Sequence, residues 1–227
     1  MIKTDLDQRL RSLKAELGSS ILVAVSKYSP IDDVAMAYEL GQMDFGENRV
    51  QDLEEKAAAF ATRGLKDVRW HFIGNLQSNK VKELLKIPNL WSIHSVSSKK
   101  LVEEIIKREG EFKGEELKLF FQLNTSHEDE KSGFDSVEEM LESMLFLKKH
   151  GGPKLVIHGL MTMGSVRSED FEAAALKCFG DLKNARELAQ KELGLSDLKL
   201  SMGMSQDYKM ALREGADYIR VGSAIFK

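Results

Sequence analysis

The chain has 227 residues, of which 42% are hydrophobic, and this size and composition suit one large globular domain with a sizeable core. Its formal net charge of −3 gives no electrostatic reason to expect a nucleic acid or an anionic membrane as a partner. The single cysteine, Cys178, excludes an internal disulfide framework and is typical of a reducing compartment. With no secretory signal and no membrane span, a cytoplasmic protein is expected, with Cys178 as a small buried core residue.

Short apolar segments rich in β-branched or aromatic residues alternate with longer segments of helical periodicity. A helix is predicted first, over Leu6–Leu17. Eight strands are then predicted, in chain order, over Ile21–Val25, Met43–Phe45, Arg69–Ile73, Leu90–His94, Leu117–Leu123, Lys154–Gly159, Lys199–Ser201 and Tyr218–Val221. Further helices are predicted between them, over Ile31–Leu40, Val50–Thr62, Asn79–Leu84, Ser98–Glu109, Val137–Lys149, Ser168–Lys191 and Gln206–Glu214.

Strands that alternate with helices predict a parallel sheet, because each parallel pair needs a crossover connection. About eight such units favour an α/β fold of the (β/α)8 TIM-barrel type with an extra N-terminal helix. An open, doubly wound sheet is the alternative, although such sheets usually have fewer strands. With three prolines and no Gly/Ser-rich or low-complexity segment, residues 1–227 are expected to form a single domain. The charged segment His127–Lys131 is expected to be an exposed loop.

In a (β/α)-barrel the functional residues lie at the C-terminal ends of the strands. Lys27 follows the first predicted strand, at the end of a largely apolar segment. Partial desolvation there is expected to lower the pKa of its ammonium group, which an imine-forming lysine requires. A lysine that reaches solvent or pairs with a carboxylate is the alternative interpretation.

Barrels often bind phosphate with the loops after strands seven and eight. Here those loops are Ser201–Ser205 and Gly222–Ser223. Both combine a glycine, which lets the backbone approach an anion, with a hydroxyl donor, and the first leads into a helix N-terminus. Together with Lys27 they predict a site for a phosphorylated aldehyde, although a sugar phosphate would satisfy the same pattern.

Arg220 lies within the last predicted strand. An arginine that faces a pyridine nitrogen keeps that nitrogen unprotonated, because arginine does not give up its proton in proteins. An unprotonated pyridine is a weaker electron sink than one held by an aspartate, so such a site favours imine formation over carbanion chemistry. An arginine paired with a barrel carboxylate is the alternative.

The histidines show no pair at metal-binding spacing, and no GxGxxG, Walker or GxSxG motif occurs. No metal site is therefore expected, and dinucleotide, nucleotide triphosphate and serine hydrolase functions are not indicated. His71 and His158 lie within predicted strands, where a hydrogen-bonded role in the core or the barrel lumen is expected.

Eight stretches of the chain together resemble the pyridoxal phosphate homeostasis protein family, which is related to the N-terminal barrel of alanine racemase. They run across almost the whole chain in family order: AVSKYSP (24–30), DFGENRVQ (44–51), WHFIGNLQSNK (70–80), IHSV (93–96), QLNTSHEDEKSGF (122–134), HGLMTMG (158–164), LSMGMSQDY (200–208) and YIRVGSAIF (218–226). Two departures are visible: Asn75 stands where histidine is more usual, and Met163–Gly164 stand where a proline is frequent.

The resemblance implies that pyridoxal 5′-phosphate (PLP) is the cofactor and forms a Schiff base with Lys27. It implies that Arg220 faces the pyridine nitrogen and that Asn48 lies near the cofactor ring. Ser201, with the backbone around Gly222 and Ser223, would hold the phosphate. Neither departure touches these positions.

The resemblance also bears on activity, because alanine racemases add a C-terminal β-domain that supplies a tyrosine as second base. This chain stops after its last predicted strand, and Tyr28 and Tyr208 are the nearest candidates for such a base. We therefore expect a PLP carrier without catalytic residues. It would act in vitamin B6 homeostasis as a monomer, with apo forms of PLP-dependent enzymes as recipients. A stand-alone PLP-dependent racemase and a sugar-phosphate enzyme are the alternatives.

Overall fold

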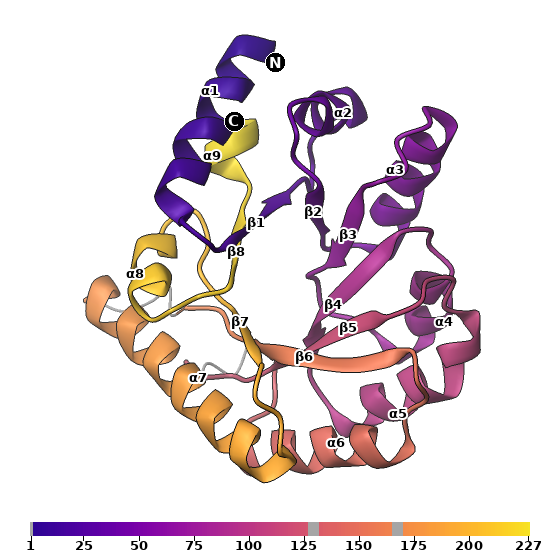
Figure 1. The fold of residues 1–227 in the computed structure, drawn as a ribbon, viewed down its shortest axis with the longest axis vertical. Helices are drawn as coiled ribbons and strands as arrows, with labels where there is room; N and C mark the ends of the chain where they lie inside the picture. Colours follow the sequence, from indigo (N-terminus) through magenta and orange to yellow (C-terminus); the bar gives the residue numbers. More distant parts are fainter. Residues whose placement is uncertain (1, 127–131, 165–169) are drawn as a thin grey trace.

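The computed structural model describes residues 2–126, 132–164 and 170–227. Eight parallel strands close into a barrel, with each strand beside the next in sequence and β8 paired with β1 (Figure 1). The closed barrel confirms the predicted (β/α)8 fold and excludes the open sheet. The strands are β1 (Ile21–Val25), β2 (Asp44–Glu47), β3 (Arg69–Phe72), β4 (Leu90–Val96), β5 (Leu117–Gln122), β6 (Leu155–Met161), β7 (Lys199–Ser201) and β8 (Tyr218–Val221).

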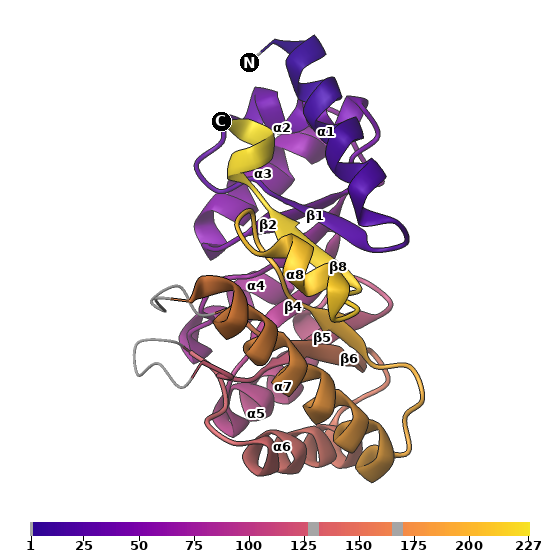
Figure 2. The ribbon, with the colours of Figure 1, turned by 90° about the vertical axis from the view of Figure 1, so that its left-hand side faces the viewer.

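The helices surround the barrel on the outside (Figures 1 and 2). They are α1 (Lys3–Leu17), α2 (Ile31–Glu39), α3 (Val50–Thr62), α4 (Val81–Leu85), α5 (Lys99–Arg108), α6 (Val137–His150), α7 (Phe171–Leu193), α8 (Tyr208–Arg213) and α9 (Ser223–Phe226). Two short 3-10 turns, η1 (Ser78–Lys80) and η2 (Glu109–Glu111), precede α4 and follow α5.

Most element boundaries agree with the sequence prediction to within a few residues, but two differ in ways that matter. The strand β4 continues to Val96, beyond its predicted end at His94, so His94 lies well inside the strand. The short helix α9 follows β8, where the sequence prediction ended the fold at the strand. The predicted start of the seventh helix at Ser168 and the predicted loop His127–Lys131 lie outside the described residues.

Side-chain caps explain where several helices begin. The Ser98 hydroxyl accepts a hydrogen bond from the Leu101 amide at the start of α5, and Ser136 does the same at the start of α6. At the start of α7 the cap is Asp170, and at its end Gly194 adopts a left-handed conformation with φ of 62°. These residues fix the helices against the strands that they follow.

The larger apolar core lies between the strands and the helix ring, and we call it the outer core. It includes a cluster of aromatic rings from Phe45, Phe60 and Trp70, with centroids 5.1 to 6.1 Å apart. Cys178 is buried in α7, as predicted for a small core residue. The outer core holds the helices on the barrel.

A second apolar cluster is separate from the outer core and consists of Val23, Phe120, Met161 and Tyr218. Successive side chains of a strand point to opposite faces, so these residues face the barrel interior while their neighbours face the helices. We call this group the lumen core. Unlike the outer core, it is surrounded by buried polar side chains.

The helix α1 lies beside α9 next to the β8–β1 pair (Figures 1 and 2). The Arg9 guanidinium of α1 donates to the carbonyl oxygen of Ile225 at 3.1 Å. The extra N-terminal helix thus covers the part of the barrel that the short α9 leaves open. Among the described residues, the helices are too short or too polar to cross a bilayer.

Candidate functional site

Lys27 lies between the ends of two neighbouring strands. The last residues of β1 pair with Gly46 of β2 on one side and with Val221 of β8 on the other. Lys27, just beyond β1, therefore lies between Asn48, which follows β2, and Gly222–Ser223, which follow β8. The strand register brings these predicted site residues to the C-terminal end of the barrel, where functional residues are expected.

The Lys27 side chain is exposed, so the predicted desolvation of its ammonium group is wrong for this structure. Burial continues along β1 only as far as Ser26, and Lys27 is the first residue beyond it. The chain then turns at Tyr28, whose φ of 66° lies in the left-handed region. The apolar character of a strand does not extend to the residue that follows its end.

Asn48 is held close to Gly74 and carries an unsatisfied acceptor. A Cβ atom at position 74 would lie 2.0 Å from the Asn48 carbonyl oxygen, so only glycine fits there. The Asn48 Oδ1 atom is buried without a hydrogen-bond partner. A buried acceptor of this kind normally has a donor, which a ligand would provide.

Ser201 is not placed where a phosphate could reach it. Its side chain is fully buried, and its hydroxyl lies 2.6 Å from the Arg220 guanidinium and 2.7 Å from Nδ1 of His94. Ser205, four residues later in the same loop, lies at the surface instead, with its hydroxyl 3.0 Å from that of Ser223. The structure thus places Ser205 with Ser223, and Ser201 inside the barrel.

Gly222 is required by a close approach of two strands. A Cβ atom there would lie 2.8 Å from the carbonyl oxygen of Val25 in β1. The loop after β8 can therefore pass directly beside the end of β1, which carries Lys27.

Arg220 is buried in the upper part of the lumen and fixed at three points. Its guanidinium donates to the Ser201 hydroxyl and, at 2.9 Å, to the Thr162 carbonyl oxygen, and its backbone amide donates to the Gly203 carbonyl oxygen. Burial lowers its pKa to about 10, although the Asp207 carboxylate opposes this change, so the group is charged at neutral pH. Both of these side-chain hydrogen bonds go to uncharged oxygens.

Two buried histidines lie below Arg220. His71 contacts the Asp44 carboxylate through Nε2 at 2.9 Å, and through Nδ1 it contacts Ser92 at 2.7 Å and Nε2 of His94 at 3.1 Å. Burial lowers the pKa of both rings, that of His94 well below its usual value; the Asp44 carboxylate opposes this lowering at His71 without cancelling it. The hydrogen-bonded lumen role predicted for His71 is confirmed.

The lumen contains a third histidine, His158, outside this pair. Its Nε2 lies 3.1 Å from the Tyr218 hydroxyl, which confirms the hydrogen-bonded role predicted for this residue. Burial, together with Lys118, lowers the pKa of His158 to about 4. All three rings are therefore neutral at pH 7.

A buried ion pair supports the ends of β1 and β2 from outside. Lys56 of α3 binds Oε1 of Glu47 and the Ser26 carbonyl oxygen, and the Ser26 hydroxyl donates to the same Oε1 atom at 2.7 Å. Glu47 and Ser26 are the residues directly before Asn48 and Lys27. The pair thus fixes the two strand ends that present these side chains.

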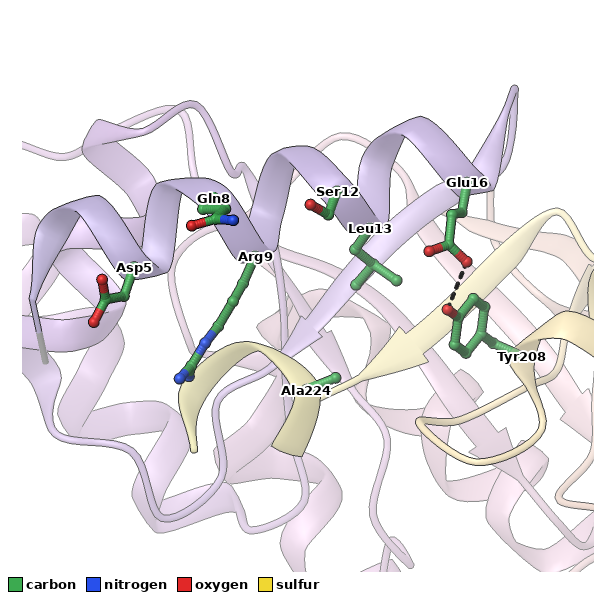
Figure 3. A pocket seen from close by; sticks show the side chains of 8 residues that line it. All are labelled: Asp5, Gln8, Arg9, Ser12, Leu13, Glu16, Tyr208 and Ala224. Atoms are coloured by element: carbon green, nitrogen blue, oxygen red, sulfur yellow. Dashed lines mark hydrogen bonds between the residues drawn. The ribbon is translucent and has the colours of Figure 1, made fainter.

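Tyr208 lies away from the barrel mouth. It borders a groove of about 500 Å³ between α1, α8 and α9, and its hydroxyl donates to Glu16 of α1 at 2.8 Å (Figure 3). Tyr28 is 74% exposed. Neither of the two tyrosines that were considered as a second base is held in a buried site.

The sequence analysis did not assign Asp44, Ser92 or His94 to the site, and it placed Ser205 in the predicted phosphate loop Ser201–Ser205 without choosing it over Ser201. Asp44 and His94 could have been found from the alternation of side chains along β2 and β4, because both fall on the inward face. The sequence gives no comparable signal for Ser205, since the loop after β7 has no regular period.

Comparison with known proteins identifies the family. The chain is 38% identical over 208 residues to the pyridoxal phosphate homeostasis protein of Schizosaccharomyces pombe, a match that covers 91% of this chain and 83% of the relative. The chain belongs to the pyridoxal phosphate homeostasis protein family. No family model matches the sequence.

Solved structures agree with this family assignment. PipY of Synechococcus elongatus PCC7942, solved with PLP bound, superimposes with a TM-score of 0.86 at 33% identity, covering 98% of this chain and 100% of PipY. Alanine racemase from Corynebacterium glutamicum superimposes with a TM-score of 0.73 at 16% identity, covering 98% of this chain and 60% of the racemase. The second match shows the fold alone, and this fold is the barrel predicted from the sequence.

Proposed function

We propose that this chain binds PLP at the C-terminal end of the barrel and holds it as a Schiff base on Lys27. The observation that carries the proposal is the strand register, which gathers Lys27, Asn48 and Gly222–Ser223 at one end of the barrel, above the buried Arg220. Membership of the family and the PLP-bound structure of PipY support the identity of the ligand.

Ser205 is the better candidate for the phosphate than Ser201. The hydroxyls of Ser205 and Ser223 lie together beside Gly222, so one anion could accept from both. The Ser201 hydroxyl already contacts Arg220 and His94 and is fully buried. We therefore propose Ser205, Gly222 and Ser223 as the phosphate site, in place of Ser201.

Arg220 and Asn48 would orient the cofactor ring. A charged guanidinium at the pyridine nitrogen would leave that nitrogen unprotonated. The Oδ1 atom of Asn48, which has no hydrogen-bond partner, would accept a hydrogen bond from a donor group of the ligand. When bound, PLP supplies an aldehyde carbon that exchanges imines with amines, while the residues named here bind and orient it.

We further propose that the protein carries PLP without transforming a substrate and passes it to apo forms of PLP-dependent enzymes. Two-base racemisation needs a second base on the opposite face of the ring. The Tyr208 hydroxyl is directed to Glu16, and Tyr28 is exposed. A monomeric state and a cytoplasmic location stay predictions of the sequence.

The test of binding is the near-ultraviolet and visible spectrum of protein reconstituted with PLP, before and after borohydride reduction. The wild type should show an imine band that reduction converts into a covalent adduct, and Lys27→Ala should lack both. Lys100→Ala, which changes an exposed lysine on α5, is the matched control and should behave as the wild type. Absence of the band in the wild type would contradict the proposal.

The test of the carrier role is hydrogen exchange at the α-carbon of L-alanine and L-serine in deuterated buffer. We expect no exchange above the rate given by free PLP. Exchange with enzymatic turnover that depends on Lys27 would instead establish the racemase alternative.

A further inference from the structure

A continuous series of hydrogen-bonding groups crosses the barrel lumen beneath the proposed cofactor site. It starts at Asp44, the first residue of β2, and ends at Arg220, near the C-terminal end of the barrel. We call it the lumen chain. Its links are Asp44 Oδ1 to His71 Nε2 at 2.9 Å, His71 Nδ1 to His94 Nε2 at 3.1 Å, His94 Nδ1 to Ser201 Oγ at 2.7 Å, and Ser201 Oγ to an Arg220 guanidinium nitrogen at 2.6 Å.

The direction of the first link is fixed by charge. Arg69 donates to both carboxylate oxygens of Asp44 and, with His71, holds the Asp44 pKa below its usual value against the opposing effect of burial. An ionised carboxylate can only accept, so the hydrogen in the first link lies on Nε2 of His71. Since this ring is neutral, its Nδ1 carries a lone pair and accepts from both of its neighbours, the Ser92 hydroxyl at 2.7 Å and Nε2 of His94 at 3.1 Å.

The remaining directions follow in turn. Two bare ring nitrogens 3.1 Å apart would repel each other, so Nε2 of His94 must carry a hydrogen and donate to His71. A neutral His94 then has a bare Nδ1, to which the Ser201 hydroxyl donates. The oxygen of that hydroxyl accepts from Arg220, which has donors only. Every link therefore donates towards Asp44.

We propose that His94, His71 and Asp44 act through Ser201 as positioning residues for Arg220, by holding its guanidinium in one orientation with a one-way hydrogen-bond chain. This inference rests on the proposed function, in which Arg220 faces the pyridine nitrogen of PLP. Arg220 has donors only, so Ser201 always accepts from it; the chain fixes the Ser201 hydroxyl hydrogen towards Nδ1 of His94 and thereby fixes the direction of the lone pair that faces Arg220. The guanidinium N–H groups that do not contact Ser201 must then donate to other acceptors.

The surroundings favour the same direction. The ring of His94 stacks on Phe120 with centroids 4.2 Å apart, which fixes the plane of its two nitrogens. Burial is the largest influence on both rings and disfavours a second proton; Arg69 and Lys118 act in the same direction on His71 and Arg220 on His94, while the Asp44 carboxylate opposes them at His71. Hydrogen bonds in a dry, low-dielectric interior reinforce one another along a chain.

The first test reads the hydrogen positions directly and needs no PLP. Nitrogen-15 NMR of the imidazole rings distinguishes the two neutral forms and the charged form. We expect both His71 and His94 to carry hydrogen on Nε2 alone at neutral pH, because the pKa values of both rings are lowered from the usual histidine value. A hydrogen on Nδ1 of either ring at neutral pH would overturn the one-way chain.

The second test measures the effect on the ligand. His94→Phe removes its links to His71 and Ser201 while keeping a ring against Phe120, and Ser201→Ala removes the links to His94 and Arg220 without a large change in volume. Each should weaken PLP binding by about tenfold, the effect of about one lost hydrogen bond to a charged group, and shift the absorption maximum of bound PLP.

His158→Phe is the matched control, because it removes a lumen imidazole whose Nε2 lies near the Tyr218 hydroxyl and not in the lumen chain. It should leave PLP affinity and the absorption maximum as in the wild type. If Ser201→Ala folds and behaves like this control, the positioning role is wrong. If the wild type itself fails to bind PLP, the proposed function fails, and the NMR result still decides the direction of the chain.

Discussion

The two buried regions of this barrel are built in different ways. The outer core joins strands to helices through apolar side chains such as Phe45, Phe60 and Trp70. The lumen core has four apolar residues, and charged or hydrogen-bonding side chains such as His94 and Arg220 are buried beside it. Burying apolar surface stabilises a fold, whereas burying a charge costs free energy unless it is well bonded.

This difference indicates a division of roles between the two regions. The outer core contributes most of the free energy of folding, since it contains nearly all of the large buried apolar side chains. The lumen contributes less to the free energy of folding, because part of its volume holds a buried cation and two neutral imidazoles in fixed positions in place of apolar side chains. Substitutions in the two regions should therefore separate stability from binding.

The largest effect is expected in the outer core. Phe60→Ala removes a fully buried ring that contacts Phe45 and Trp70, and it should lower the free energy of unfolding by about 3 to 5 kcal/mol. Urea denaturation measures this loss. Leu188→Ala, at a side chain that is 40% exposed, is the control and should change stability by less than about 0.5 kcal/mol.

In the lumen the same measurement should give a different pattern. Arg220→Met leaves the Ser201 hydroxyl and the Thr162 carbonyl oxygen without their donor, which should lower the free energy of unfolding by about 1 to 3 kcal/mol, less than Phe60→Ala. PLP affinity should also fall by at least about tenfold, since a donor to the ring is lost. A large loss of stability with unchanged affinity would contradict the division between the two regions.

The lumen histidines should make stability depend on pH. Burial lowers the pKa values of His71, His94 and His158 in the folded state, so the unfolded chain binds protons more readily. Stability is then complete above the unfolded histidine pKa of about 6.5 and is lost as pH falls towards the folded values. The free energy of unfolding should decrease by at least about 1 kcal/mol between about pH 6.5 and 5.

Urea denaturation at a series of pH values measures this slope, and His158→Phe should make it shallower. Asp44 changes the slope in a separate range. Its lowered pKa gives a stabilising contribution that is complete above the usual aspartate pKa of about 3.9 and is lost only as the pH falls below that value. A flat profile between about pH 6.5 and 5 would mean that these imidazoles accept protons in the folded state.

The smallest effect is expected at the loop after β7. Ser205→Ala should weaken PLP binding by about five- to tenfold, because one hydrogen bond to the phosphate is lost. Binding of pyridoxal, which lacks the phosphate, should not change. Titration of both ligands followed by absorbance makes the comparison, and equal losses for the two ligands would remove Ser205 from the phosphate site.

The strand and helix pattern was sufficient to predict the barrel, because alternating elements with few loop signals allow few other folds. Lys27, Asn48 and Gly222 could be placed at one end because they follow neighbouring strands. The distinction between Ser201 and Ser205 could not be predicted. Both are hydroxyls in one loop, and Gly203 between them, with φ of 88°, redirects the chain without any periodic signal.

The hydrogen-bonded pairing of His71 with His94 was also beyond prediction from the sequence. The two residues are 23 positions apart on neighbouring strands, and their pairing depends on an irregularity in the β3–β4 register. The exposure of Lys27 was missed for a simpler reason. Strand ends are uncertain by a few residues, and here one residue decides between a buried and an exposed side chain.

The strand β7 has three residues, and its ladder to β8 contains the single residue pair Ser201–Tyr218. Backbone hydrogen bonds from Asp217 to Leu200, from Met202 to Tyr218 and from Arg220 to Gly203 complete this short junction, where transient local opening should need little free energy. Ser205 and Ser223 stand on opposite sides of this junction. An anion bound by both hydroxyls would link the two strands. Amide hydrogen exchange in β7 and β8 should therefore slow when the ligand binds. It should become faster again when the cofactor leaves.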